Sequence, residues 1–323
     1  MKNSKNSIGK SQILFNRVKI ITHSGSFHAD DVFAVATVKL WLEKNGSKSF
    51  FNKTHIEIIR TRKPEIIAQG DVVIDVGGEY DSVKKIFDHH QKGGAGEHFN
   101  GIPYSSFGLV WKEYGENICG SQAVADILDK IIVLPIDADD NGVDLYKLVY
   151  PDVRPYSIHN LIDIYNFVFK EKGEKNLDDN FSKAVDFAKD VLRREIKLSL
   201  IEIEEKKYVE QIYQKSEDQR IIILDKNISD ESCEDMLVKY EGPLFVVKPD
   251  GGSKNWKVKT VKKKRFSFES RKDLPKEWAG KIGEELVQET SVPDALFCHN
   301  KRFVIVAKTK EGAVELARLA MEA

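Results

Sequence analysis

Short apolar runs alternate with longer amphipathic stretches from Arg17 to about Asp140. Runs such as RVKIITHS, HIEIIRT, DVVIDVG and KKIFDHH are rich in β-branched residues, which is typical of buried strands. The stretches VFAVATVKLWLEK, FGLVWKEYG and SQAVADILDKIIVLPIDADDNG have the length and spacing of helices. Strands that alternate with helices predict an α/β domain with a mostly parallel sheet and helices on both faces.

The pattern changes twice further along the chain. Residues 151–215 are predicted to be helical throughout, with a long connecting helix in SKAVDFAKDVLRREIKLSLIEIEEKKYVEQIY. After Lys215 the runs RIIILD, PLFVVKP and NWKVKTV predict strands, and the turn residues at 250–252 predict a hairpin. A strand in RFVIVAK and a helix from about Lys310 close the chain. The predicted organisation is an α/β domain at 1–150, a helical connector at 151–215 and a second, smaller α/β domain at 216–323.

Composition excludes several classes of protein. The 323 residues are 41% hydrophobic and 31% charged, which is ordinary for a soluble globular protein. The net charge of −1 neither indicates nor excludes a polyanionic partner. Three scattered cysteines fit neither a disulfide framework nor a CxxC zinc site. The N-terminus lacks the apolar run of a signal peptide and no stretch approaches the ~18 apolar residues of a membrane span, so a cytoplasmic protein without membrane contact is predicted.

Four clusters of acidic and histidine residues fall at predicted strand ends: FHADD at 27–31, IDVGG at 74–78, FDHHQ at 87–91 and IDADDNG at 136–142. Each one alone is explained by a helix cap or a turn. Ligands of open α/β sheets bind at the carboxyl ends of the strands, so the four clusters together predict one site. Carboxylates and imidazoles without cysteine favour two Mn²⁺ or Mg²⁺ ions over zinc.

Other segments each have two interpretations. The loop at 92–106, KGGAGEHFNGIPYSS, is either a lid or a plain surface loop. His23 is either a strand histidine bonded to backbone or part of the site, and Arg60 and Arg62 either contact phosphate or make structural pairs. A basic run beside aromatic residues is either a solvated face or a surface for single-stranded nucleic acid; its members are Trp256, Lys257, Lys259, Lys262, Lys263, Lys264, Arg265, Phe266 and Phe268.

The triplet Asp88-His89-His90 resembles the signature of the DHH phosphoesterase superfamily. Further motifs occur in the order found in the Myg (melanocyte proliferating gene) family of exonucleases, and the resemblance covers residues 19–320. They are THSGSFHADDVFA, IIRTRKPE, DVVIDVGGEYD, FDHHQ, SSFGLVW, IDADDNG, FSFESRKDLPKEW and KTKEGAVELAR. The resemblance implies a DHH-type catalytic domain.

The resemblance also implies a role for each site residue. His28 and Asp30 would bind one ion, Asp31 and His89 the other, and Asp75 would bridge them. An acid of the fourth motif would complete the second ion's shell, with Asp137 preferred and Asp140 nearly equal beside Asp139. His90 would face the scissile phosphate, and Asp88 would orient the imidazoles. In the second domain Ser270, Arg271 and Lys272 form a short segment whose cationic pair would contact the substrate phosphate, unless they belong to an exposed basic loop.

The function predicted from these residues and this resemblance is metal-dependent 3′ to 5′ exonuclease activity on single-stranded RNA or short oligonucleotides. One alternative is a small-phosphate hydrolase, such as a pyrophosphatase or dinucleotide phosphodiesterase, with the same metal site. An alternative of another class is a non-catalytic RNA-binding protein. The superfamily resemblance weakly favours a homodimer.

Overall fold

A computed structural model describes residues 17–45, 55–166 and 174–323 of the chain. The molecule divides into two compact units, residues 1–199 and 200–323, and the division falls within one long helix. No helix of the described residues is long and apolar enough to cross a membrane. The predicted domain boundaries at 150 and 215 stay a prediction, and each unit is described by itself below.

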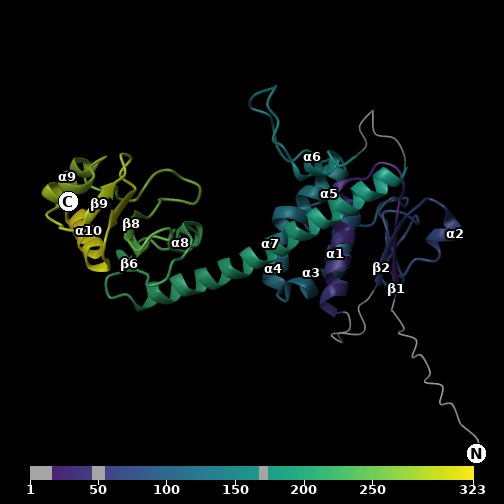
Figure 1. Ribbon diagram of the computed structural model, residues 1–323, viewed down its shortest axis with the longest axis horizontal. Helices are drawn as coiled ribbons and strands as arrows, with labels where there is room; N and C mark the ends of the chain where they lie inside the picture. The colour runs from purple at the N-terminus through teal and green to yellow at the C-terminus, as the bar shows by residue number, and fades with distance from the viewer. Residues whose placement is uncertain (1–16, 46–54, 167–173) are drawn as a thin grey trace, which may run out of the picture. The chain divides into compact units, whose positions relative to one another are not determined.

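The first unit contains a sheet and the helices that flank it (Figure 1). Its elements are β1 (Arg17–Thr22), α1 (Ala29–Asn45), β2 (His55–Arg60), α2 (Pro64–Ile67), β3 (Val72–Ile74), β4 (Tyr80–Asp81), β5 (Ile86–Phe87), α3 (Ser106–Cys119), α4 (Gln122–Leu128), the π-helix η1 (Asp129–Val133), α5 (Leu134–Asp140), α6 (Ile158–Asp163) and the start of α7 (Glu174–Lys215).

The strands of this unit form one five-stranded sheet in the order β2-β1-β3-β5-β4. Strands β2, β1, β3 and β5 are parallel, and only the edge strand β4 is antiparallel to its neighbour. The predicted α/β class with a mostly parallel sheet is therefore confirmed. Parallel strands carry their C-terminal ends to the same edge of the sheet, which gathers the motifs that follow β1, β3 and β5.

Successive residues of a strand point to opposite faces of the sheet, and in β1 and β3 neighbouring residues on both faces are apolar and buried. On one face Ile21 and Val73 pack in a cluster with Ile66 and Ile67 of the short helix α2. Helix α1 lies on the opposite side of the sheet from α2 (Figure 1), and it is buried along most of its length from Ala29 to Leu40. A helix that is covered all round needs apolar residues on every side, which explains the continuous run VFAVATV.

Two details of the predicted secondary structure are wrong. The fourth acidic motif does not lie at a strand end. The helix predicted for SQAVADILDKIIVLPIDADDNG is confirmed instead, because the chain from Gln122 to Asp140 is helical throughout, as α4, η1 and α5. Buried apolar residues recur there at helical spacing, and the acids lie in the final helix, α5. Residues 151–157 of the predicted connector are also not helical, although the long helix is confirmed as α7.

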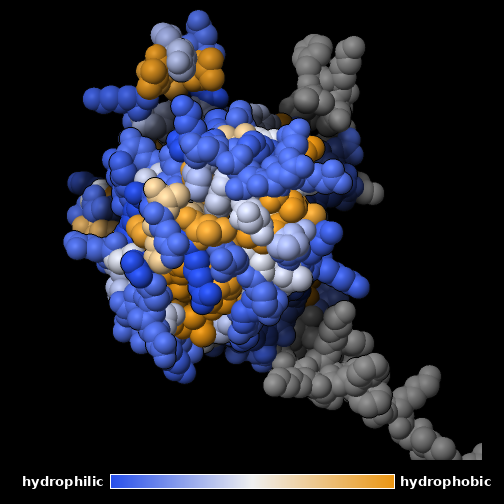
Figure 2. Space-filling model, turned by 90° about the vertical axis from the view of Figure 1, so that its left-hand side faces the viewer, coloured by the Kyte–Doolittle hydropathy of each residue, from blue (hydrophilic) through white to orange (hydrophobic). Residues whose placement is uncertain are grey.

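The second unit contains another five-stranded sheet, in the order β6-β7-β8-β10-β9. Its elements are β6 (Ile221–Ile223), α8 (Asp230–Leu237), β7 (Phe245–Pro249), β8 (Trp256–Thr260), the 3₁₀ helix η2 (Lys276–Trp278), α9 (Gly283–Thr290), β9 (Ala295–Cys298), β10 (Val304–Ala307) and α10 (Lys310–Glu322). The hairpin of β7 and β8, the last strand and the last helix are confirmed. The surface of this unit mixes hydrophilic residues with apolar areas (Figure 2).

Candidate metal centre

The residue after β3, Asp75, has an unusual backbone conformation. Its φ is 55°, in the left-handed region that non-glycine residues rarely occupy. Gly77 and Gly78 follow with φ of 114° and 76°, so the chain turns sharply at the end of the strand. Ser106 Oγ donates to Asp75 Oδ1 over 3.0 Å, and the side chain is 4% exposed. Strain of this kind clusters at functional sites, where the surrounding structure enforces it.

The start of helix α1 presents the acids of the first motif. Asp31 Oδ1 accepts a hydrogen bond from the backbone N–H of His28 over 2.9 Å, so this carboxylate caps the helix. The neighbouring Asp30 is completely buried, yet among the described residues neither of its oxygens accepts a hydrogen bond. A buried carboxylate without donors is costly. Burial first, and then the charges of Asp75, Asp140 and Asp31, raise the pKa of Asp30 well above its ordinary value.

Two groups of ligand-type atoms lie within the first unit. One comprises His28, Asp30 and Asp140, and the other comprises Asp75, His89 and His90; in each group the donor atoms lie within 4.8 Å of one another. His89 lies between them, because its Nε2 is 3.4 Å from Asp75 Oδ1 and 3.3 Å from Asp140 Oδ2. Burial lowers the pKa of His89, but Asp75 and Asp140 outweigh that effect and raise it overall.

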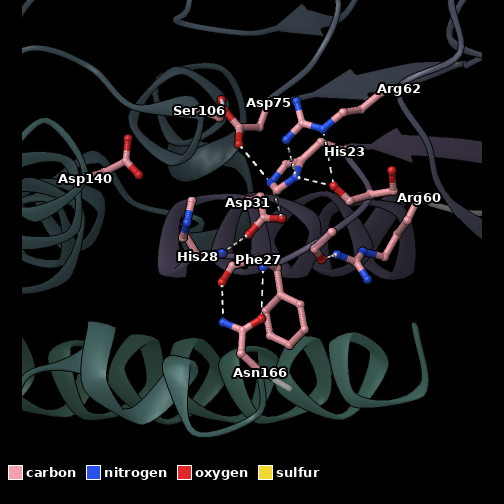
Figure 3. Close-up of polar contacts among 12 residues, drawn as sticks. His23, Phe27, His28, Asp31, Arg60, Arg62, Asp75, Ser106, Asp140 and Asn166 are labelled. Atoms are coloured by element: carbon pink, nitrogen blue, oxygen red, sulfur yellow. Dashed lines mark hydrogen bonds and ion pairs between the residues drawn. The ribbon is translucent and has the colours of Figure 1, made fainter. Parts of the chain in front are cut away.

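His23, at the end of β1, lies closer to the acids than the sequence suggests. Its ring is 2% exposed, and its Nε2 is 3.2 Å from Asp31 Oδ2 and 3.3 Å from Asp75 Oδ2 without a hydrogen-bond geometry (Figure 3). Its Nδ1 lies 3.2 Å from the Ser24 carbonyl oxygen. Among the described residues Nε2 has no hydrogen-bond partner and faces the two carboxylates, which makes it a ligand-type nitrogen of the site. The signal in the sequence was its place directly after a strand.

Asp88 holds the third motif in place. Its Oδ1 accepts from the backbone N–H of His90 at 3.1 Å and lies 2.8 Å from His90 Nδ1, while its Oδ2 accepts from the Gly78 N–H at 2.6 Å. One carboxylate therefore joins the turn after β3 to the histidines after β5. A cavity of about 460 Å³ lies here, lined by His23, His28, Arg62, Asp75, Asp88, His89, His90 and Asp140. The ring of His90 is 63% exposed and faces this cavity.

Of the two acids proposed from the fourth motif, the structure places Asp140 with the ligand-type groups and Asp137 elsewhere. Asp137 is completely buried beneath the glycine-rich loop, and three donors surround its carboxylate. His98 Nε2 is 2.6 Å from Oδ2, and Ser105 Oγ and Gly108 N donate to Oδ1 at 2.5 and 3.0 Å. Sequence reasoning missed His98, because nothing in the segment distinguishes it from a loop residue.

Two arginines and one further histidine near the site differ in their partners. Arg60 donates to the Gly25 carbonyl and pairs with Asp178 at 2.9 Å, and its side chain is 2% exposed, so its role is structural. Arg62 lies at the cavity with Nη2 3.1 Å from His23 Nδ1. His159 of α6, which the sequence pattern did not indicate, pairs with Asp139 at 3.2 Å. Its ring stacks 6.5 Å from that of His28.

The predicted phosphate-binding pair of the second unit is engaged with backbone. Arg271 donates to the carbonyl oxygens of Pro243 and Val238, both at 3.1 Å, and Lys272 donates to that of Met321 at 2.8 Å. Ser270 Oγ lies 2.8 Å from Thr260 Oγ1. These contacts hold the segment onto the unit, and substrate binding by it stays a prediction.

The whole chain is similar to one family of proteins. The model of the MYG1 exonuclease family, described as "Uncharacterised protein family (UPF0160)", matches residues 19–321. The chain is 31% identical to the MYG1 protein YER156C of Saccharomyces cerevisiae, over 94% of this chain and 95% of that protein. It is 27% identical to the MYG1 protein C694.04c of Schizosaccharomyces pombe, over 95% and 98%, and 27% identical to the human protein named MYG1 exonuclease, over 93% and 85%. No solved structure matches.

Proposed function

Because the chain belongs to the MYG1 exonuclease family, we propose that it is a divalent-metal-dependent phosphodiesterase that removes nucleotides from the 3′ end of single-stranded RNA or short oligonucleotides. The human, rat and bovine relatives carry the name MYG1 exonuclease. The observation that carries the proposal is the pair of ligand-type groups, one of His28, Asp30 and Asp140 and one of Asp75, His89 and His90, which meet where His89 Nε2 lies 3.3 Å from Asp140 Oδ2.

The residues present suit two divalent cations. Three buried ligand-type residues of the site, Asp30, Asp31 and His23, hold polar atoms without a hydrogen-bond partner among the described residues. Cations between them would satisfy these atoms and reverse the unfavourable burial of Asp30. His28, Asp30 and Asp140 would hold one ion. Asp75 would contribute to the second together with His89, His23 and Asp31, and oxygen with imidazole donors favours Mn²⁺ or Mg²⁺.

Asp75 directs both carboxylate oxygens at histidines of the site. Its Oδ2 faces His23, while its Oδ1 faces His89 and His90. Burial raises the pKa of Asp75, but the bond to His89 and the charges of His23 and His90 outweigh it, so the pKa is lowered overall. The carboxylate is therefore ionised at neutral pH, as a ligand must be.

The protein's own side chains would orient the phosphodiester. When bound, two close cations supply an activated water and neutralise charge on the phosphoryl group. Asp88 fixes the ring of His90 through Nδ1, which leaves the exposed part of the ring for a phosphate oxygen. Arg62, an exposed residue at the same cavity, offers a second donor.

Hydrolysis of 5′-labelled single-stranded RNA, with pyrophosphate assayed in parallel, tests the proposal. With Mn²⁺ we expect a ladder that shortens from the 3′ end, and with EDTA no reaction. Asp75→Ala should lower the rate by roughly 10³-fold, since several kcal/mol of charge stabilisation depend on the ligands. Asp81→Ala on β4, an acid that pairs with Lys84, is the control and should keep full activity.

The outcomes separate the alternatives. Release of phosphate from pyrophosphate, without RNA cleavage, would favour the small-phosphate hydrolase. RNA binding that is unchanged by EDTA and by Asp75→Ala, with no turnover of either substrate, would favour a non-catalytic binding protein.

A further inference from the structure

The basic run of the second unit is largely neutralised by helix α8. Lys259 Nζ is 2.7 Å from Asp230, Lys262 Nζ is 2.8 Å from Glu234, and Arg265 Nε is 2.7 Å from Asp235. The acids of one helix thus pair with successive cations of strand β8 and the segment after it. A surface that binds nucleic acid mainly through its charge is therefore not what the structure presents here.

The tip of the same segment has a different character. Residues 262–270 form a hairpin, in which Lys262 and Ser270 are bridged and the Lys263 N–H donates to the Glu269 carbonyl at 2.9 Å. At its tip Phe266 is 83% and Phe268 99% exposed. Two phenylalanines held almost entirely in water on one short hairpin contribute nothing to the core of the unit.

The backbone is strained at one of these phenylalanines. The Ser267 N–H donates to the Lys264 carbonyl at 3.2 Å, which closes a tight turn with Phe266 at its third position. Phe266 has φ of 60°, where a turn of this kind favours glycine. A bulky residue at this position costs conformational free energy and leaves an aromatic ring exposed, a combination that is typical of a binding element.

Cations accompany both rings. Arg265 lies over the ring of Phe266 with its Cζ 4.6 Å from the centroid, and Lys262 Nζ lies 5.9 Å from that of Phe268. Lys263 pairs with Glu269 at 3.1 Å within the hairpin. Among the described residues, no carboxylate lies within ion-pair distance of Lys264. Stacking rings beside one or two available cations match a strand of unpaired nucleotides, whose bases offer flat faces.

We propose that the hairpin at 262–270 binds single-stranded nucleic acid by stacking bases on Phe266 and Phe268. The proposal rests on the function proposed above, since it locates a binding element for the same class of substrate. Because Lys262, Lys263 and Arg265 are paired with acids, only one or two phosphate contacts are expected and binding depends weakly on salt. The slope of log K against log salt is expected to be about −0.7 to −1.4 for one or two phosphate contacts.

Fluorescence anisotropy of labelled oligo(U) with the full chain in EDTA tests the proposal, because EDTA stops turnover. The double variant Phe266→Ala with Phe268→Ala should bind at least about 10-fold more weakly, and Phe268→Trp should bind as well as the original and show quenching of its indole on binding. Ile282→Ala, an apolar residue of the same unit that is 61% exposed, is the matched control and should bind normally.

A parallel assay keeps this proposal separate from the proposed reaction. Hydrolysis of bis(p-nitrophenyl) phosphate with Mn²⁺ reports on the metal centre alone, and it should be unchanged in the double variant. A protein that hydrolyses no ester but loses oligo(U) binding in the double variant would still support the hairpin's role. Unchanged oligo(U) affinity in the double variant would overturn it, as would a double variant that changes only the oligomeric state in gel filtration.

Discussion

Both units contain a cluster of charged side chains, but the charges balance one another in only one of them. In the first unit the carboxylates of Asp30, Asp75 and Asp140 lie together, and the oxygens of Asp30 have no donor among the described residues. In the second unit the Asp230 carboxylate forms ion pairs with Lys248 and Lys259. Burial raises the pKa of Asp30 far above its ordinary value. At Asp230 burial has the same effect, but the two lysines outweigh it and lower the pKa to about 2.

The difference teaches how a ligand site is distinguished from a structural ion pair. Protein groups complete the charge balance around Asp230, and Lys248 also donates to the Ile228 carbonyl. Around Asp30 the protein leaves the balance incomplete, which destabilises the fold unless a cation binds. Both clusters consist of charged residues near element ends, so only the three-dimensional partners separate them.

The largest effects are expected for Asp30→Asn. The variant should lose roughly 10³-fold in Mn²⁺-dependent activity, because a ligand is lost. In the metal-free protein it should raise the melting temperature, since it removes a buried carboxyl group that has no hydrogen-bond donor and lies among other acids. Mn²⁺ should stabilise the original chain by about 2.7 kcal/mol at 100 times its Kd and the variant much less. Thermal unfolding with and without Mn²⁺ measures this, and equal stabilisation of both chains would refute the assignment of Asp30.

Asp137→Asn sharpens the comparison within the first unit. Asp137 is as buried as Asp30, but His98, Ser105 and Gly108 satisfy its oxygens. An amide nitrogen would face these donors, so we expect the metal-free protein to lose roughly 2 kcal/mol of unfolding free energy. The sign is opposite to that of Asp30→Asn. Urea unfolding measures the loss, and retention of the Mn²⁺ stabilisation would show that Asp137 supports the site without ligating an ion.

The contrast between Asp30 and Asp137 also shows what could be predicted from the sequence. Strand periodicity and the order of the motifs predict the parallel sheet and gather the residues that follow β1, β3 and β5. Helical spacing also predicts the helix that carries the fourth motif. None of these patterns reveals which acid of that helix faces the cavity. That depends on the packing of His98, 39 residues away along the chain.

The strands and the last helix of the second unit could be predicted from the sequence, but the partners of its basic residues could not. Alternation and turn residues predict the β7–β8 hairpin, and the pattern at the end of the chain predicts β10 and α10. The basic run after Trp256 predicts either a solvated face or a nucleic-acid surface, but its cations pair with the acids of α8. Sequence reasoning had no means of pairing two segments that meet only in the folded unit.

The smallest effect is expected for Asp230→Asn, which removes the carboxylate that pairs with Lys248 and Lys259. The folded-state pKa of about 2 lies below the ordinary value of 3.8, so the ionised carboxylate stabilises the unit above about pH 4, and this contribution is lost as the pH falls toward 2. Because the carboxylate is 35% exposed, we expect a loss of only about 1 kcal/mol at neutral pH. Urea unfolding of both chains at several pH values should show the difference vanish near pH 2, with Mn²⁺ stabilisation intact throughout. A difference that persists at pH 2 would mean that the carboxylate's charge is not what stabilises this cluster.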